Sequence, residues 1–160
     1  MKALIVYSTM TGNTRKLAEA ALEVLPADAL AVAVEDAPDP AEFDFVIVGF
    51  WLKAGKPDPK SADYLKKAKG HKNLFLFATH GARPGSDHAE NAMRHAVSLA
   101  EGARVSGTFG CFGEVDPGKL EMVKAKPQPP VWLADAPDAA GHPDAADLEN
   151  LKAALRAAMG

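Results

Sequence analysis

The stretch IVYSTMTGNTRKLAEA, residues 5–20, runs from an apolar segment through a polar loop into helix-forming sequence. Between Ser8 and Thr14 the loop carries four hydroxyl side chains, one glycine and one asparagine, and no lysine or arginine. In an open α/β sheet, ligands bind where a strand ends and the following helix begins. Backbone amides at a helix N-terminus bind anions without any cationic side chain. We therefore predict that residues 8–14 hold a phosphate group through neutral donors.

The composition of this loop favours phosphate binding over helix capping alone. Capping needs only one or two hydroxyls, and Gly12 allows a ligand to approach the backbone closely. Other phosphate-binding loops do not match, because both the pattern Gly-x-x-x-x-Gly-Lys-Ser/Thr and the three-glycine dinucleotide pattern are absent. The acidic pair that follows the first strand of a response-regulator receiver is also missing.

Outside the loop, apolar runs alternate with helix-like stretches along the chain. Continuous apolar runs are typical of strands that are buried on both faces of a parallel sheet. Helices are expected between them, the third opened by a cap at Ser86. Strand and helix in alternation predict an α/β fold with a doubly wound parallel sheet. The predicted strands are 3–7, 29–34, 45–50, 74–78 and 103–109, and the predicted helices are 13–25, 61–69 and 87–101.

The C-terminal part of the chain departs from this alternation. Residues 127–143 contain five prolines and are interpreted as a surface excursion or linker. A last helix is predicted over 145–159, where apolar residues recur at spacings of three and four and should pack on the sheet. Asp144 is its expected N-cap, with Asp147 three residues further on.

Length and composition limit the class of protein. A chain of 160 residues, 48% hydrophobic and 24% charged, suits one globular domain over residues 1–160. A net charge of −3 predicts no attraction to nucleic acid or to an anionic membrane. The one cysteine, Cys111, is expected to be a buried structural thiol and fits a reducing compartment. The first apolar run is too short to cross a bilayer, so we predict a cytoplasmic protein. The scattered histidines predict no metal site.

The motif IVYSTMTGNTRKLA resembles the phosphate loop of the flavodoxin family in its aliphatic residues and at Tyr7, Thr9, Gly12, Thr14 and Ala18. Ala21 departs from that motif, which has a larger aliphatic residue there. The resemblance implies a three-layer fold with a five-stranded parallel sheet of order 2-1-3-4-5 and FMN as the cofactor. It also implies that the FMN phosphate contacts the whole loop: Ser8, Thr9, Met10, Thr11, Gly12, Asn13 and Thr14.

The loop after the third strand, GFWLKAGKPD, is the expected site of the isoalloxazine ring. A flat apolar ring is best held by an aromatic face, so Trp51 is the first stacking candidate and Phe50 the second. In flavodoxins a carbonyl in this loop turns toward the flavin when an electron arrives, and Gly55 would make that turn easy. An ordinary turn is an equal alternative for Gly55. The cofactor contacts predicted here are Phe50, Trp51, Leu52, Lys53, Ala54 and Gly55.

The loop after the fourth strand, ATHGARPGSDHAEN, should follow the pyrimidine edge of the flavin. Flavodoxins often carry an acidic residue or tyrosine there, whereas this chain has histidine and arginine. Positive groups at that edge would raise the potential above that of a low-potential flavodoxin. The alternative for the histidine is a solvated residue on the rim. The contacts predicted here are Thr79, His80, Gly81, Ala82 and Arg83.

Charge is unevenly distributed along the chain. Residues 51–72 hold seven lysines and two aspartates, a net of +5 that leaves −8 on the rest. Lys53, Lys56 and Lys60 flank Trp51, so a redox protein partner with an acidic docking face, or an anionic small substrate, is expected. A solvated helix face is the alternative for the later lysines.

Two functions follow from the resemblance. The first is a one-electron carrier between redox partners, favoured by the lack of a recognisable nicotinamide site. The second is an FMN-dependent reductase or oxidase acting on a quinone, a tetrapyrrole or a similar conjugated acceptor. The basic rim and the additional segment 127–143 favour the second function.

Overall fold

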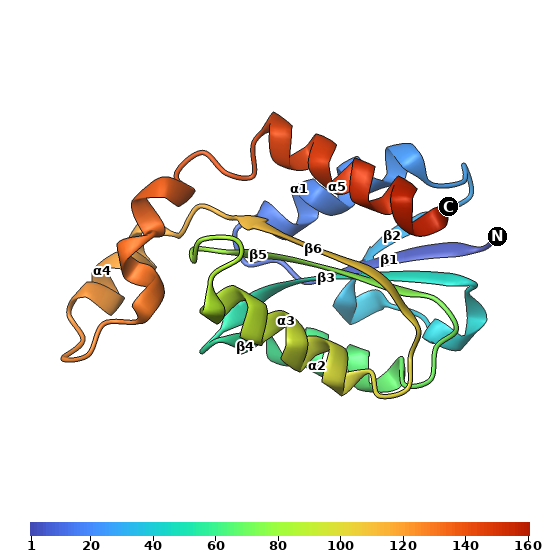
Figure 1. The fold of residues 1–160 in the computed structure, drawn as a ribbon, viewed down its shortest axis with the longest axis horizontal. Coiled ribbons are helices and arrows are strands. Elements are labelled where there is room, and N and C mark those ends of the chain that lie inside the picture. Colours follow the sequence, from blue (N-terminus) through green and yellow to red (C-terminus); the bar gives the residue numbers. More distant parts are fainter.

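A computed structural model describes all 160 residues and shows a parallel sheet between layers of helices (Figure 1). The strand order is β2-β1-β3-β5-β6, which confirms the predicted order 2-1-3-4-5 of five parallel strands. A two-residue strand, β4, was not predicted and pairs antiparallel with the end of β3. The strands are β1 (Ala3–Tyr7), β2 (Leu30–Ala33), β3 (Phe45–Lys53), β4 (Lys56–Pro57), β5 (Leu74–His80) and β6 (Val105–Phe112).

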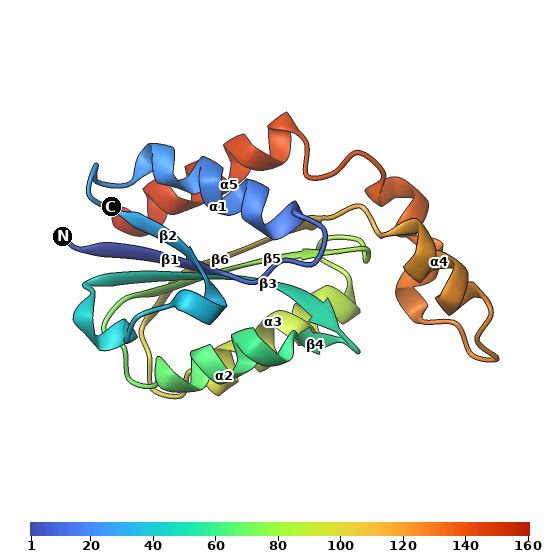
Figure 2. The ribbon, with the colours of Figure 1, turned by 180° about the vertical axis from the view of Figure 1, so that it is seen from behind.

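Helices cover both faces of the sheet, as a doubly wound fold requires. Figures 1 and 2 show α1 (Asn13–Ala21) and α5 (Ala145–Met159) on one face, and α2 (Pro59–Lys67) and α3 (Asp87–Leu99) on the other. A further helix, α4 (Pro117–Lys124), lies beyond the carboxyl ends of the strands. Short 3-10 turns complete the chain: Leu22–Val24, Val34–Asp36, Pro40–Glu42, Val131–Ala134 and Ala136–Ala139.

The apolar runs form the core because successive side chains of a strand point to opposite faces. Val46, Val48 and Phe50 of β3 are fully buried under α2 and α3, while Phe45 and Ile47 are fully buried under α1 and α5. Each such side chain contributes roughly 1.5–3 kcal/mol when it leaves water. Together these two layers fix the position of the strand ends.

The last helix confirms its predicted bounds, 145–159. Asp144 and Asp147 form a reciprocal capping box, in which each carboxylate accepts the other residue's backbone N–H. Leu151 and Leu155 are fully buried against the sheet. No helix in the structure combines the length and the apolar character that a membrane span requires.

Several predicted boundaries were wrong, and two of them matter for the site. β3 continues through Trp51, Leu52 and Lys53, because Trp51 pairs with β5 and the hairpin with β4 extends the strand. β5 likewise continues through Thr79 and His80, which pair with β6. Residues that were expected in loops therefore lie on paired strands. Residues 127–143, expected to be a surface excursion or linker, contain two 3-10 turns, and α4, which was not predicted, precedes them.

Candidate functional site

The polar loop after β1 presents unpaired backbone amides at the start of α1. Gly12 is the N-cap in the left-handed region, φ 94°, and no side chain caps this helix. Helix capping therefore does not explain the hydroxyls. The Gly12 amide donates to Thr9 Oγ1 at 2.9 Å, which closes the loop on itself. Within the protein, the amides of Met10, Thr11 and Asn13 find no acceptor.

Two of the loop hydroxyls hold neighbouring strands in place. Thr14 Oγ1 lies 3.0 Å from Thr79 Oγ1 in a buried pair that ties α1 to β5. Ser8 Oγ accepts a hydrogen bond from Trp51 Nε1 at 3.2 Å, which ties the loop to β3. The loop is thus connected to β3 and β5 through side chains, and this fixes the direction of its free amides.

The strand alternation of β3 separates the two aromatic candidates. Trp51 is half-buried and faces the cavity beside the polar loop, where Ser8 orients its indole. Phe50, the next residue back, points to the opposite face and is fully buried in the core beneath α2 and α3. Phe50 is therefore corrected from a stacking candidate to a core residue.

The turn after β3 requires unusual backbone angles. Ala54 and Gly55 have φ of 51° and 76°, both in the left-handed region, which a two-residue hairpin of type I′ demands. A Cβ on Gly55 would stand 3.3 Å from His88 Cε1. Glycine is therefore the residue that this backbone and its neighbour both accept.

His80 ends β5 and forms part of the cavity floor. Its Nδ1 lies 2.8 Å from the carbonyl oxygen of Ala82, and the side chain is buried. Burial is the main cause that lowers the pKa of His80 below 6.5, so the imidazole is neutral at pH 7. The expectation of a solvated rim histidine is wrong, and so is the expectation of a positive charge from this residue.

Arg83 turns away from the cavity. Its guanidinium forms ion pairs with Asp138 at 3.0 Å and Asp135 at 3.8 Å, and its backbone amide donates to Asp135. Both carboxylates belong to the segment after α4. The two residues expected to place positive charge at the flavin edge, His80 and Arg83, thus supply none there.

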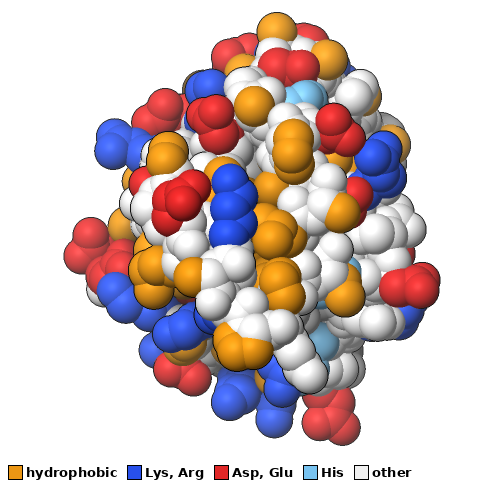
Figure 3. Space-filling view, turned by 90° about the vertical axis from the view of Figure 1, so that its left-hand side faces the viewer, with side chains coloured by type: hydrophobic (Ala, Val, Ile, Leu, Met, Phe, Trp, Pro, Cys, Tyr) orange, Lys and Arg blue, Asp and Glu red, His pale blue; other side chains and the backbone are white.

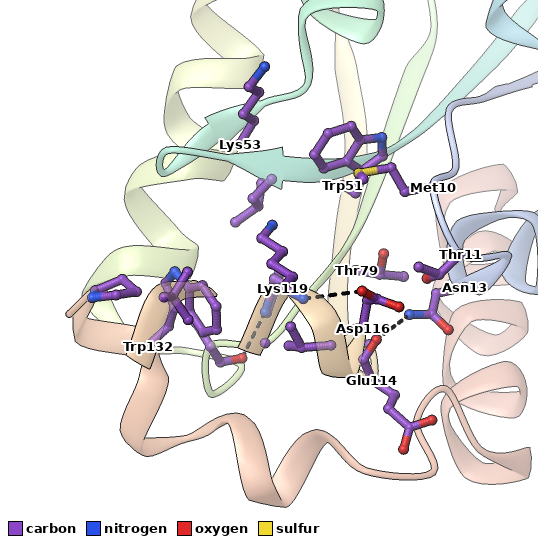
Figure 4. A pocket seen from close by; sticks show the side chains of 18 of the residues that line it. Met10, Thr11, Asn13, Trp51, Lys53, Thr79, Glu114, Asp116, Lys119 and Trp132 are labelled. Carbon is purple, nitrogen blue, oxygen red and sulfur yellow. Dashed lines mark hydrogen bonds between the residues drawn. The ribbon is translucent and has the colours of Figure 1, made fainter. Parts of the chain in front are cut away.

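A cavity of about 950 Å³ opens at the carboxyl ends of the strands, between the polar loop, Trp51 and α4 (Figure 4). Fourteen of the eighteen predicted site residues line it: Thr9, Met10, Thr11, Asn13, Thr14, Trp51, Leu52, Lys53, Ala54, Gly55, Thr79, His80, Gly81 and Ala82. The remaining four do not: Ser8, Gly12, Phe50 and Arg83.

The far wall of this cavity, which residues 113–132 build, was not predicted from the sequence. These residues are Gly113, Glu114, Val115, Asp116, Gly118, Lys119, Met122, Val123, Lys126, Pro130 and Trp132, joined by His88 of α3. One signal was available, since Asp116 followed by proline is a helix start. The Asp116 carboxylate indeed accepts the Lys119 amide at 3.1 Å.

The basic rim is narrower than the lysine count suggested. Lys60 pairs with Glu35 at 2.6 Å and Lys72 with Asp44 at 2.7 Å, and the latter pair lowers the pKa of Asp44 to about 2. Lys53 has no carboxylate within 4.0 Å and lines the cavity. The positive charge at the cavity therefore comes from Lys53 together with two lysines of the missed wall.

Two other groups have structural roles. Cys111 is buried in β6, and burial raises the pKa of its thiol, as expected of a structural cysteine. His142, Asp144 and Asp147 bring ligand-type atoms within 4.8 Å of one another. The two aspartates form the capping box of α5, and His142 Nδ1 lies 2.6 Å from Asp147.

Comparisons with known proteins agree with this geometry. The chain is 30% identical to the flavodoxin-like domain-containing protein BilS of Clostridium symbiosum, over 92% of this chain and 90% of that protein. Among solved structures, a flavodoxin of Streptococcus pneumoniae superposes with a TM-score of 0.63 at 16% identity, covering 99% of this chain and 96% of that one. A Lactobacillus acidophilus flavoprotein, solved in complex with FMN, gives a TM-score of 0.56 at 19% identity, covering 68% and 92%. The family model of the flavodoxin domain matches residues 4–156, and the chain therefore belongs to the flavodoxin family.

Proposed function

We propose that this protein binds FMN noncovalently and carries electrons, one at a time, between redox protein partners. The observation that carries the proposal is one continuous cavity, with the free amides of the polar loop at one end and the indole of Trp51 beside it. Bound flavin supplies the redox chemistry, and the protein supplies binding, orientation and electrostatic tuning. The Lactobacillus acidophilus flavoprotein that was solved with FMN supports this cofactor.

The residues present fit FMN at each of its parts. The amides of Met10, Thr11 and Asn13, at the positive end of α1, suit a phosphate. The indole face of Trp51 suits a flat ring system. A cavity of about 950 Å³ is within the range of sites for small molecules and cofactors. The chain thus offers an anion site and an aromatic face in one pocket.

The chain's own groups also tune the site. Ala54 and Gly55 line the cavity, and the conformational freedom of Gly55 allows the peptide between them to turn its carbonyl or its amide inward. His80 is neutral and adds no charge to the floor. The groups that can tune the reduction potential of the bound flavin are therefore the backbone of this turn and the lysines around the cavity mouth.

The cavity mouth has the character of a docking surface. Met10, Met122 and Val131 are 66%, 70% and 77% exposed, and the two methionines line the cavity. Figure 3 looks onto the end of the molecule that carries α4, where hydrophobic side chains lie on one side of a central Lys or Arg, acidic side chains lie on its other side, and further Lys or Arg side chains lie below. Lys53 and Lys126 add positive charge there. A redox partner with an acidic face fits this surface.

Titration with FMN tests the proposal. Binding should quench the flavin fluorescence with one FMN per chain and shift its visible absorption. A carrier should then accept electrons from a separate NADPH-dependent flavoprotein reductase and should not oxidise NADPH alone. No quenching at micromolar protein would refute FMN binding. Cytoplasmic location stays a prediction.

A reductase acting on a quinone, a tetrapyrrole or a similar conjugated acceptor is the second candidate. The far wall of the cavity favours it, because that wall adds Trp132 and Lys119 to a pocket that Trp51 and the polar loop already form. The test is steady reduction of a small quinone by the purified protein with NADH or NADPH as the reductant. Turnover without any partner protein would show that the protein is this reductase and not a carrier.

A further inference from the structure

The segment after β6 folds back over the cavity as a structured arm, residues 113–143. Figure 1 shows it beyond the strand ends, with α4 at its tip. The arm is held at several points: Asn13 Nδ2 donates to the Glu114 carbonyl at 3.0 Å, and Arg83 pairs with Asp135 and Asp138. Three fixed contacts of this kind make the arm a wall of the cavity.

Trp132 is packed against the end of β5. A Cβ on Gly81 would stand 2.6 Å from Val115 and 3.2 Å from the Trp132 ring, so only glycine lets the arm come this close. Trp132 is half-buried and lines the cavity. Its indole is therefore a fixed aromatic surface, and no family motif predicted it.

Two indole rings of the cavity meet at one ammonium group. Lys119 Nζ lies over the Trp51 ring, 5.8 Å from its centre, and over the Trp132 ring, 5.9 Å from its centre. Figure 4 shows Lys119 between the two tryptophans, which come from β3 and from the arm. Both aromatic faces are thus turned toward the same part of the cavity, where a positive charge stands.

The charge at this point lacks a partner within the protein. Lys119, Lys53 and Lys126 all line the cavity, and none has a carboxylate within 4.0 Å. Burial, and then repulsion from Lys126 and Lys53, lowers the pKa of Lys119. Of the two acids on the arm wall, Asp116 accepts the Lys119 amide through one carboxylate oxygen, and Glu114 lies beside Asn13 near the polar loop. An anion here would relieve the repulsion among the lysines.

We propose that the arm builds a second binding site in the cavity, for a small, planar, aromatic anion such as a conjugated carboxylate or sulfonate. Trp132 provides the stacking surface, and Lys119 provides the charge partner, with Lys126 and Lys53 at the rim. The site rests on the proposed function in one respect, since FMN takes the polar loop and Trp51. A planar ring stacks on the aromatic faces, and its negative group pairs with the Lys119 ammonium.

A matched pair of redox-inert probes tests this site by binding alone. Calorimetry on the FMN-loaded protein compares naphthalene sulfonate with the uncharged naphthalene sulfonamide, while the visible absorption reports whether FMN stays bound. The sulfonate should bind about tenfold more tightly than the sulfonamide. Lys119→Gln should abolish that difference, and Lys119→Arg should restore most of it.

Lys124→Gln is the control for Lys119→Gln, because Lys124 lies on the same helix, pairs with Glu121 at 3.5 Å and does not line the cavity. It should leave the preference for the sulfonate intact. Trp132→Leu should weaken both probes about tenfold, and Trp132→Phe, which keeps an aromatic face and the fold of the arm, should weaken them less.

Three outcomes would overturn the second site. One is a sulfonate preference that survives Lys119→Gln, and another is equal binding to Trp132→Leu and to the unmodified protein. The third is displacement of FMN by the sulfonate, since the two ligands would then share one site. A protein that fails to bind FMN, against the proposed function, is titrated without FMN. There, the same dependence on Lys119 supports the anion site by itself.

Discussion

The two walls of the cavity attract negative charge by different physical means. The polar loop, residues 8–14, has no charged side chain in its sequence, and its neighbours Arg15 and Lys16 turn to Glu19 and to the Pro143 carbonyl. The arm opposite carries Lys119 and Lys126. Several amides are free at the start of α1, whereas at the start of α4 Pro117 has no N–H and the Lys119 amide is bonded to Asp116. The arm therefore relies more on the ammonium groups of its side chains.

Because the two walls bind anions differently, they should respond differently to salt and to substitution. Amides fixed by Thr9 and by the strand ends act at short range and depend on geometry. Exposed ammonium groups such as that of Lys126 act over longer distances and are screened by salt. Substitutions in the loop should therefore change FMN affinity most, and substitutions in the arm should change the binding of other anions and partners.

A carboxylate placed in the loop should produce the largest effect. Thr11→Asp keeps a helix-compatible residue near the start of α1, where acids are tolerated, but sets a negative charge against the phosphate. FMN affinity should fall about 100-fold, measured by quenching of flavin fluorescence. Thr11→Val removes only the hydroxyl and should cost about tenfold or less. Unchanged affinity in Thr11→Asp would place the phosphate elsewhere.

Substitutions of the two tryptophans should separate the binding of FMN at Trp51 from the binding of a second ligand at the arm. Trp51→Ala should weaken FMN by about 1–3 kcal/mol, because it removes the aromatic face beside the loop. Trp132→Phe should have a smaller effect on FMN, since Trp132 belongs to the opposite wall. Titration of both variants with FMN measures the two losses of FMN affinity and their ratio. If Trp132→Phe costs as much as Trp51→Ala, both indoles enclose the flavin and the distinction between the walls disappears.

His80, on the cavity floor between the two walls, should give a pH-dependent change of intermediate size in the free energy of unfolding. Burial lowers the pKa of His80 below 6.5 in the folded protein. The unfolded chain therefore binds a proton more readily, so the free energy of unfolding should fall as pH drops through about 6.5. Urea unfolding between pH 7.5 and about 5 should show this slope in the unmodified protein. His80→Gln should flatten it, and His95→Gln, at a half-buried position on α3, should retain it.

The loop and the strands could be predicted because local sequence determines them. Continuous apolar runs identify buried parallel strands, and the strand order then places the loop at the sheet edge where ligands bind. The free amides also follow from the sequence, since residues 8–14 precede a helix. The exact ends of β3 and β5 could not be predicted, because Trp51 and His80 are strand residues only through pairing with β5 and β6.

The arm could not be predicted because distant contacts hold it. The prolines in 127–143 indicated a surface excursion or linker, and contacts with residues far away in the sequence, such as Gly81 beneath Val115 and Trp132, place this segment on the cavity. The same holds for Arg83: the sequence indicates a cation, but its partners Asp135 and Asp138 lie more than fifty residues further along the chain. Charge counted along the chain therefore overestimated the basic rim.

Loss of the ion pairs that anchor the arm should have the smallest effect on the free energy of unfolding. It should also distinguish the two walls most clearly. Arg83→Ala removes ion pairs that are largely exposed, so the free energy of unfolding should change by no more than about 1 kcal/mol. Amide hydrogen exchange in residues 113–143 should nevertheless become faster, while exchange in α1 and the loop should not change. Arg15→Ala, which breaks an equally exposed pair with Glu19, is the control and should leave the arm protected. Unchanged exchange in Arg83→Ala would mean that packing of Trp132 on Gly81 holds the arm without the ion pairs. In that case close packing holds the arm in place, as it does the polar loop. Charge would then account only for the arm's attraction for anions.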